Sequence, residues 1–224
     1  MAVQSAPIQV IPISMRYLRA KRLFDILFVV LIAPLVLFVG VIIALLIRVD
    51  SKGPIFFRQT RFGQNGVAFE MLKFRSMYTH VTDDLHRQYI ARYMNGEKSN
   101  GETTADLSYK LADDPRITRV GRFIRKTSLD ELPQFWNVLR GQMTLVGPRP
   151  PVPYEVEQYS PRDWLRLSGK PGLTGTWQVY GRSRVTFQEM IEMDINYLQH
   201  PSLWRDLKLI VLTVPVMVLG RGGA

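Results

Sequence analysis

An uncharged apolar run from Ile26 to Ile47 constrains the fold of this chain more than any other feature. The run is 22 residues long, and a helix of about 20 residues crosses the hydrocarbon core of a bilayer. Pro34 lies inside it, and a proline within a helix removes one backbone hydrogen bond and bends the axis. The sequence therefore predicts a membrane helix with a bend near its middle.

Both flanks of this run are basic. The flanking cations are Arg16, Arg19, Lys21 and Arg22 before the run and Arg48, Lys52, Arg58 and Arg61 after it. Because loops rich in Lys and Arg remain in the cytoplasm, a simple spanning helix should be basic on one side only. The pattern favours a re-entrant hairpin whose legs, each about 17 Å long, dip into one leaflet and return. A single span is the alternative, since spanning helices tolerate proline. Asp25, where the run starts, is expected at the headgroups beside Arg22.

Composition narrows the classes of partner and chemistry. The net charge is +10, from 29 basic and 19 acidic residues, and such an excess implies an anionic partner: lipid headgroups, a phosphorylated substrate or nucleic acid. The chain has no cysteine, which excludes disulfides, thiolate catalysis and cysteine–zinc sites. Its three histidines form no His-x-x-x-His pair, so a histidine zinc site is not expected.

The remaining pattern predicts an α+β fold that is mainly helical. Two short strands are expected at 55–59 and 67–74, joined by the Gly-rich turn 63–66. Helices are expected at 83–94, 128–139, 154–167, 186–199 and 203–219, and a polar loop at 95–110. The uncharged part of the last helix is too short to cross a bilayer. This helix belongs either to the core or to the membrane interface, and Trp204 with the charges around it favours an interfacial amphipathic helix.

The segment from Arg122 to Gln134, RFIRKTSLDELPQ, holds the main candidates for chemistry. Ser128 and Glu131 have the spacing of a capping box, which predicts a helix beginning at Ser128 with Asp130 and Glu131 in its first turn. One interpretation is structural, because acidic residues stabilise helix N-termini. The other is a phosphoryl-transfer site. A helix N-terminus and the preceding Arg and Lys residues attract phosphate, one carboxylate acts as a nucleophile that forms an acyl-phosphate, and its neighbour binds Mg²⁺.

Other candidates for anion binding are more ambiguous. Lys73 and Arg75 alternate on a predicted strand, so both should point to one face, which is either solvated or substrate-binding. Arg149 stands between prolines that restrict the backbone, either in a structural turn or as a presented guanidinium. The Gly-rich stretch 170–178 and the pair at Gly181 and Arg182 are either loops or phosphate and base contacts. There is no Walker A motif and no GxGxxG.

Taken in order, these segments resemble those of the bacterial sugar transferases, the small monotopic phosphoglycosyl transferases. The resemblance rests on KRLFDILF, PIFFRQTRFG, MLKFRSM, DPRITRVGRFIRKTSLDELPQFWNVLRGQMTLVGPRP, PGLTGTWQVYGRS and DINYLQHPSLWRDLKLIVLT. It covers nearly everything after residue 20. One departure is Ala33, where the family often has a serine before the membrane proline.

The resemblance implies a reaction and roles for residues. The family transfers a sugar 1-phosphate from a nucleotide diphosphate sugar, usually a UDP-sugar, to polyprenol phosphate such as undecaprenyl phosphate, and releases UMP. This is the first membrane step of bacterial exopolysaccharide, O-antigen or glycoprotein glycan synthesis. By resemblance, Asp130 attacks the β-phosphate, Glu131 binds Mg²⁺, and Arg125 matches the arginine of the phosphate site. Lys73, Arg75, Arg149 and Arg182 complete the expected substrate-binding set.

The expected organisation has three parts: a leader at 1–20, a re-entrant membrane hairpin at 21–48, and a catalytic domain with interfacial helices at 49–224. The protein is expected on the cytoplasmic face of the bacterial inner membrane, in contact with its lipids. The rival class is a membrane-tethered basic module that binds nucleic acid or anionic lipid. No nucleic-acid motif is present, so nucleic acid is not an expected partner. The sequence leaves the sugar and the oligomeric state open.

Overall fold

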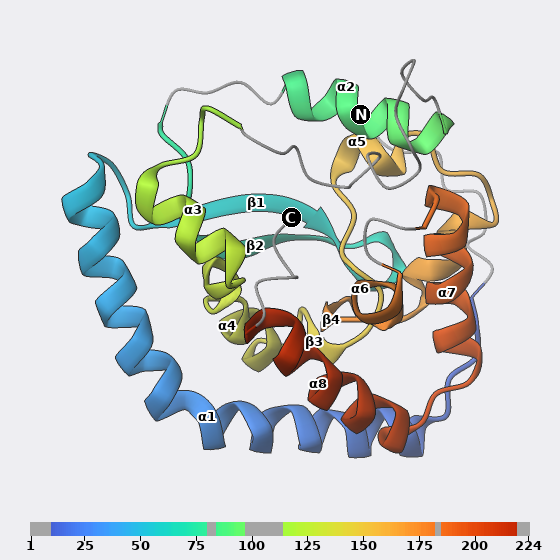
Figure 1. The fold of residues 1–224 in the computed structure, drawn as a ribbon. Helices are drawn as coiled ribbons and strands as arrows, with labels where there is room; N and C mark the ends of the chain where they lie inside the picture. Colours follow the sequence, from blue (N-terminus) through green and yellow to red (C-terminus); the bar gives the residue numbers. More distant parts are fainter. Residues whose placement is uncertain (1–9, 80–83, 97–113, 182–184, 219–224) are drawn as a thin grey trace.

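The computed structural model describes residues 10–79, 84–96, 114–181 and 185–218, and it is mainly helical with two small sheets (Figure 1). The elements are α1 (Met15–Asp50), β1 (Phe56–Phe62), η1 (Gln64–Gly66), β2 (Ala68–Phe74), α2 (Asp84–Asn95), α3 (Arg119–Lys126), η2 (Leu129–Glu131), α4 (Gln134–Leu139), β3 (Thr144–Val146), α5 (Pro153–Val156), η3 (Asp163–Ser168), β4 (Gly172–Thr174), α6 (Thr176–Tyr180), α7 (Phe187–Gln199) and α8 (Leu203–Val218). The pair β1–β2 is antiparallel and the pair β3–β4 is parallel. This arrangement confirms the predicted mainly helical α+β class.

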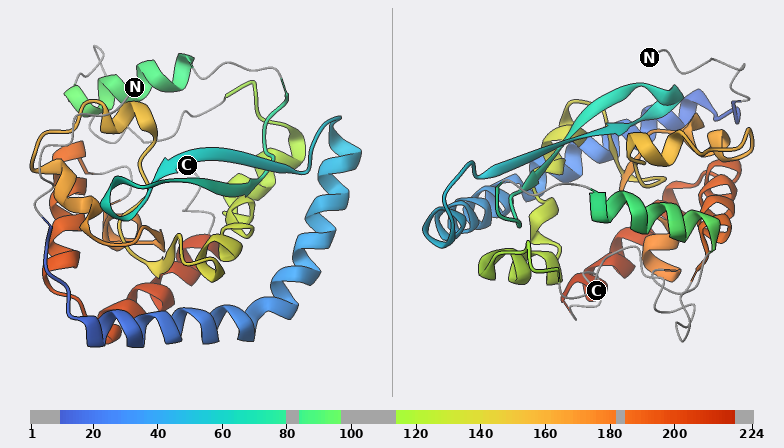
Figure 2. Two further views of the ribbon diagram at one scale, coloured as in Figure 1. Left: turned by 180° about the vertical axis from the view of Figure 1, so that it is seen from behind. Right: turned by 90° about the horizontal axis from the view of Figure 1, so that it is seen from above.

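Helix α1 is one continuous helix with a bend, and it runs along two sides of the domain (Figures 1 and 2). Its one proline, Pro34, lies near the middle, where a missing backbone hydrogen bond permits bending. Within the described residues, α1 is the one helix long and apolar enough to cross a membrane, judged by length and composition. The predicted membrane segment 21–48 lies within this helix, and the bend divides the helix into two legs (Figure 1).

The first half of α1 is fastened to the domain by charged side chains. Lys21 donates to Asp206 of α8 at 2.7 Å. Asp25 is 2% exposed and accepts hydrogen bonds from the Thr144 hydroxyl at 2.6 Å and the Leu145 amide at 3.2 Å. The expectation that Asp25 lies at the headgroups is therefore wrong. The β3 backbone and the Thr144 hydroxyl replace the water that this carboxylate would otherwise need.

The hairpin β1–β2 confirms the two predicted strands. Its register pairs Phe57 with Lys73 and Arg61 with Phe69, and η1 forms the connection, with Asn65 and Gly66 at positive φ. Figure 1 shows α3 and α4 between this hairpin and α1. The main core gathers apolar side chains from α1, β2, α4, β3, α7 and α8, including Val29, Phe69, Met71, Val138, Val146, Tyr197 and Leu209.

The predicted helix at 128–139 is wrong in its first part. Ser128 has φ 56° and makes no side-chain cap; it follows the C-terminal end of α3. A short 3₁₀ turn, η2, follows it, and α4 begins only at Gln134, directly after Pro133. A proline cannot donate the backbone hydrogen bond that a continuous helix needs at this position. The carboxylates therefore lie in a tight turn between two helices, and not at the N-terminus of a long helix.

The predicted helix at 154–167 is also wrong, because the chain forms the separate short elements α5 and η3, with Pro161 between them. Helices α2, α7 and α8 confirm three other predictions within one or two residues. Thr186 and Glu189 cap α7 reciprocally. In α8, Asp206 and Leu209 are buried while Trp204 and Val211 are exposed, so the helix contributes one face to the core. Most of the predicted loop at 95–110 lies outside the described residues.

Candidate functional site

The two carboxylates of η2 lie beside the ammonium group of Lys73. The Lys73 Nζ is 2.7 Å from a Glu131 oxygen and 3.9 Å from a Asp130 oxygen. The side chains are partly buried, at 21% exposure for Lys73, 12% for Asp130 and 29% for Glu131. At such distances and in partial shelter from water, the cation stabilises both negative charges. The turn therefore holds a carboxylate pair together with a cation and leaves the group partly accessible to solvent.

The position of this pair follows from the packing of its apolar neighbours. Leu129 and Leu132 flank the pair in sequence and pack against a cluster that includes Ile43 and Ile47 of α1. The same cluster contains Phe74, the residue that follows Lys73 at the end of β2. Packing on the second half of α1 thus brings η2 and the end of β2 together. It also places the carboxylates next to the helix that could enter a membrane.

Arg125 lies in the last turn of α3, five positions before Asp130. In the described ranges of the chain, its guanidinium makes no hydrogen bond or ion pair. Its charge, together with the hydrogen bonds and charge of Arg116, helps to hold the pKa of Asp114 below its usual value. The basic helix α3 therefore presents, close in sequence to the pair, a guanidinium that makes no hydrogen bond or ion pair among the described residues.

Arg75 is not brought to the carboxylates. It lies just after β2 and is 5% exposed, and its guanidinium donates to the Ser51 backbone at 2.7 Å and to the Lys52 backbone at 3.0 Å. The expectation that Lys73 and Arg75 share a face is wrong, because the strand ends at Phe74 and its alternation ends with it. Lys73 contacts the carboxylate pair, whereas Arg75 donates hydrogen bonds to the backbone that follows α1.

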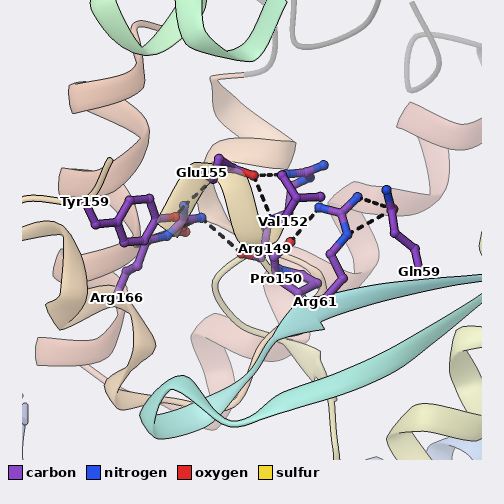
Figure 3. Close-up of polar contacts among 9 residues, drawn as sticks. Gln59, Arg61, Arg149, Pro150, Val152, Glu155, Tyr159 and Arg166 are labelled. Atoms are coloured by element: carbon purple, nitrogen blue, oxygen red, sulfur yellow. Dashed lines mark hydrogen bonds and ion pairs between the residues drawn. The ribbon is translucent and has the colours of Figure 1, made fainter. Parts of the chain in front are cut away.

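Arg149 belongs to an internal ion network (Figure 3). It lies 3.7 Å from Glu155, a residue that is 0% exposed and also accepts a hydrogen bond from the Val152 amide. Arg166 belongs to the same network: its guanidinium donates to the Arg149 backbone carbonyl at 3.1 Å and to the Asp194 carboxylate at 2.6 Å. The solvent-free surroundings raise the pKa of Asp194 to about 6.

The hairpin shows how far the Arg149 loop lies from the carboxylates. Arg61 donates to the Pro150 carbonyl at 3.0 Å, and the β1–β2 register places Arg61 four positions from the level of Lys73. At roughly 3.4 Å per residue, the two levels are about 14 Å apart. The backbone of this loop therefore meets the hairpin well away from the carboxylate pair.

The Gly-rich segments have a structural explanation. The backbones of Gly147 and Gly172 approach so closely that a Cβ on Gly172 would lie 2.1 Å from the Gly147 nitrogen. Reciprocal hydrogen bonds, Gly147 N–H to Thr174 and Gly172 N–H to Pro148, join the two loops. Close approach of β3 and β4 thus requires glycine here. The expected contact at Arg182 lies outside the described residues.

The sequence analysis missed Asn137, which is 1% exposed and bonds to the backbone of β2. An isolated asparagine inside an apolar helix, FWNVL, was the available signal, since a buried amide needs partners.

The carboxylate pair fits a single magnesium ion bound jointly with a substrate. No group of three or more His, Asp or Glu side chains that could enclose a metal occurs among the residues with described positions. Mg²⁺, however, is commonly held by one or two carboxylates together with substrate phosphates. The Lys73 ammonium at 2.7 Å shows that Glu131 already attracts a cation. Glu131, with Asp130 beside it, would hold the ion.

Comparison with known proteins identifies the family of this chain. Residues 16–220 match the family described as bacterial sugar transferase. Similar relatives are a galactosyl transferase, CpsE, of Streptococcus agalactiae (44% identical over 92% of this chain and 44% of the relative) and a UDP-galactose-lipid carrier transferase of Erwinia amylovora (41%, over 94% and 42%). The exopolysaccharide production protein ExoY of Sinorhizobium fredii is 39% identical over 91% of this chain and 87% of its own length. The chain thus spans less than half of the first two relatives and most of the third. It belongs to the bacterial sugar transferase family.

Proposed function

We propose that this chain transfers a sugar 1-phosphate from a UDP-sugar to polyprenol phosphate, such as undecaprenyl phosphate, at the cytoplasmic face of the bacterial inner membrane. The single observation that carries the proposal is the carboxylate pair of η2, held beside Lys73 and next to the apolar helix α1. The names of the relatives, which speak of UDP-galactose, a lipid carrier and exopolysaccharide production, support the choice of donor, acceptor and pathway class.

In the first step, an Asp130 carboxylate oxygen attacks the β-phosphorus of the donor. A bond forms between this oxygen and phosphorus, and the bond from phosphorus to the bridging oxygen breaks. UMP departs with the bridging oxygen and the electron pair, leaving the sugar phosphate covalently attached to Asp130. Lys73 and Arg125 offset the negative charge that accumulates where an anionic nucleophile meets a diphosphate.

In the second step, an oxygen of polyprenol phosphate attacks the same phosphorus. The acyl-phosphate bond breaks, Asp130 regains its carboxylate, and a polyprenyl diphosphate sugar leaves. The acceptor is embedded in lipid, so the reacting group must lie close to the membrane. Packing of Leu129 and Leu132 against the apolar helix α1 supports this placement.

Magnesium supports the same chemistry. Bound at Glu131, Mg²⁺ would neutralise phosphate charge and help to orient the donor.

We also propose that α1 re-enters the membrane, with both flanks on the cytoplasmic side. Exposed apolar side chains on both sides of the bend, including Leu31, Leu35 and Phe38, support this topology. Because the chain has no cysteine, Val10→Cys introduces a unique thiol before α1. A membrane-impermeant maleimide should label it only after the cells are opened. Labelling of intact cells would show that α1 spans the bilayer.

The test of the reaction is release of UMP from a panel of UDP-sugars with Mg²⁺ and polyprenol phosphate in membranes. Asp130→Asn should abolish turnover and remain membrane-bound, while Glu157→Gln, at an exposed acid outside the site, retains activity. Mass spectrometry after incubation with donor alone should find a sugar phosphate on the peptide that contains Asp130. Substantial transfer by Asp130→Asn, or an unmodified peptide while product forms, would overturn the mechanism.

A further inference from the structure

We infer that Asn137 is a positioning residue, which sets the distance between Lys73 and the carboxylate pair; the inference rests on the proposed function. Asn137 lies in α4 and is 1% exposed. Its side chain touches neither carboxylate in any described contact. Its effect on catalysis must therefore pass through the strand that carries Lys73.

The side chain of Asn137 pairs with β2 as a neighbouring strand would. Its Nδ2 donates to the Glu70 carbonyl at 2.8 Å, and its Oδ1 accepts from the Leu72 amide at 3.0 Å. Both bonds are made by backbone groups of β2, whose other edge pairs with β1. Among short side chains, only a carboxamide offers a hydrogen-bond donor and an acceptor side by side. The orientation of this amide is unambiguous, because a backbone carbonyl only accepts and a backbone N–H only donates.

A second set of bonds fixes the amide from the other side. The Asn137 Nδ2 also donates to the Gln142 Oε1 at 2.8 Å. The Asn137 carbonyl accepts from the Gln142 amide at 3.0 Å and from the Met143 amide at 3.2 Å. The residue is thus held where α4 ends, and its side chain has little rotational freedom.

These contacts join the two halves of the site. Lys73 follows Leu72 directly, and Glu131 lies six positions before Asn137, on the other side of Pro133. The two halves meet at the 2.7 Å contact between the Lys73 Nζ and Glu131. If β2 slides relative to α4, this distance changes. A displacement of about 1 Å at a catalytic group can reduce turnover about 100-fold.

The experiment compares Asn137→Leu with a matched control, Thr213→Val, in the same membranes. Thr213 of α8 also makes two partly buried hydrogen bonds, to Thr174 at 2.8 Å and to Leu209 at 2.7 Å, and no contact among the described residues joins it to the carboxylate pair. We expect Asn137→Leu to lower kcat about 100-fold with little change in the KM for the UDP-sugar, and Thr213→Val to leave kcat within about twofold.

The decisive measurement is a double-mutant cycle with Lys73→Met. If Asn137 acts through Lys73, adding Asn137→Leu to Lys73→Met lowers kcat by less than about twofold more. A purely structural role predicts that the two losses multiply, and this outcome would overturn the inference. If Asn137→Leu fails to fold, Gln142→Leu removes only one partner of the amide. Gln142→Leu should lower kcat less than Asn137→Leu does. Added to Lys73→Met, it should cause almost no further loss of kcat.

A readout that does not depend on activity separates this inference from the proposed function. Reductive methylation of surface amines, followed by mass spectrometry, reports the accessibility of Lys73. We expect Lys73 to be modified several-fold faster in Asn137→Leu than in the parent or in Thr213→Val. An unchanged rate in a folded variant would overturn the inference, even if the parent is active. An inactive parent with faster labelling in the variant would instead refute the proposed function alone.

Discussion

Breaking the buried ion pair between Lys21 and Asp206 should destabilise this protein far more than breaking an exposed ion pair. The two groups are 2.7 Å apart, and their side chains are 9% and 1% exposed. Asp206 also accepts hydrogen bonds from Tyr197 at 2.6 Å and from Tyr17 at 2.9 Å. The network therefore fastens the first half of α1 to α7 and α8. The change to test is Lys21→Met, which keeps most of the length of the side chain and removes its charge.

The magnitude follows from what the variant leaves behind. At an effective dielectric constant of 20, the gross attraction of unit charges at this distance is about 6 kcal/mol. Removing one partner of a buried pair typically costs about 3–5 kcal/mol, because the other charge stays buried. The two tyrosine hydroxyls still stabilise the Asp206 carboxylate, which places the expected loss near 3 kcal/mol. For a chain of this size, such a loss lowers the unfolding temperature by roughly 6–12 °C.

The assay is thermal unfolding in lipid nanodiscs, followed by tryptophan fluorescence. Asp206→Asn in the Lys21→Met background should recover much of the loss, because it removes the uncompensated charge. The matched control is Arg58→Met, which removes the exposed Arg58–Glu70 pair at 3.5 Å and should shift the transition by less than about 2 °C. If the unfolding temperature of Lys21→Met is no lower than that of Arg58→Met, the Lys21–Asp206 pair does not anchor the first half of α1.

Three further predictions concern the site and its surroundings. Arg125→Met should raise the KM for the UDP-sugar about tenfold, because its guanidinium makes no hydrogen bond or ion pair in the described structure. The exposed Arg119→Met should leave the KM unchanged; equal KM values for the two variants in steady-state kinetics would contradict the assignment. Glu131→Gln should lower kcat and shift the magnesium titration to higher concentrations, and a titration that coincides with the parent's would show that Glu131 is not a ligand. Asp114→Asn should destabilise the protein at pH 7, because hydrogen bonds from Arg116 lower the pKa of Asp114. That contribution is present above the unfolded pKa of about 3.9 and is lost as the pH falls through the lower folded pKa. The difference in unfolding temperature should therefore shrink as the pH falls below about 3.9, and a difference that does not shrink there would contradict this origin.

Local sequence patterns determined the elements whose signals need no distant partner. Pro34 predicted the bend in α1, and a Gly-rich turn between alternating residues predicted the β1–β2 hairpin. Such features depend on backbone restriction and on periodicity over a few residues, and both can be read from neighbours in the chain. The basic residues before Asp130 and Glu131 could also be read locally, whereas the predicted helix start at Ser128 was wrong.

Tertiary structure alone decided which side chains meet. Lys73 pairs with Glu131 across 58 positions of sequence, while Arg75, two residues later, turns to the end of α1. Asp25 is enclosed by β3, although its neighbours resemble a membrane segment. Ser128 takes a left-handed conformation at the end of α3, and α4 begins only after Pro133. The capping pattern at Ser128 therefore does not start a helix. Long-range packing overrides local preference at these positions, since burying apolar surface contributes more free energy than a single cap or turn preference.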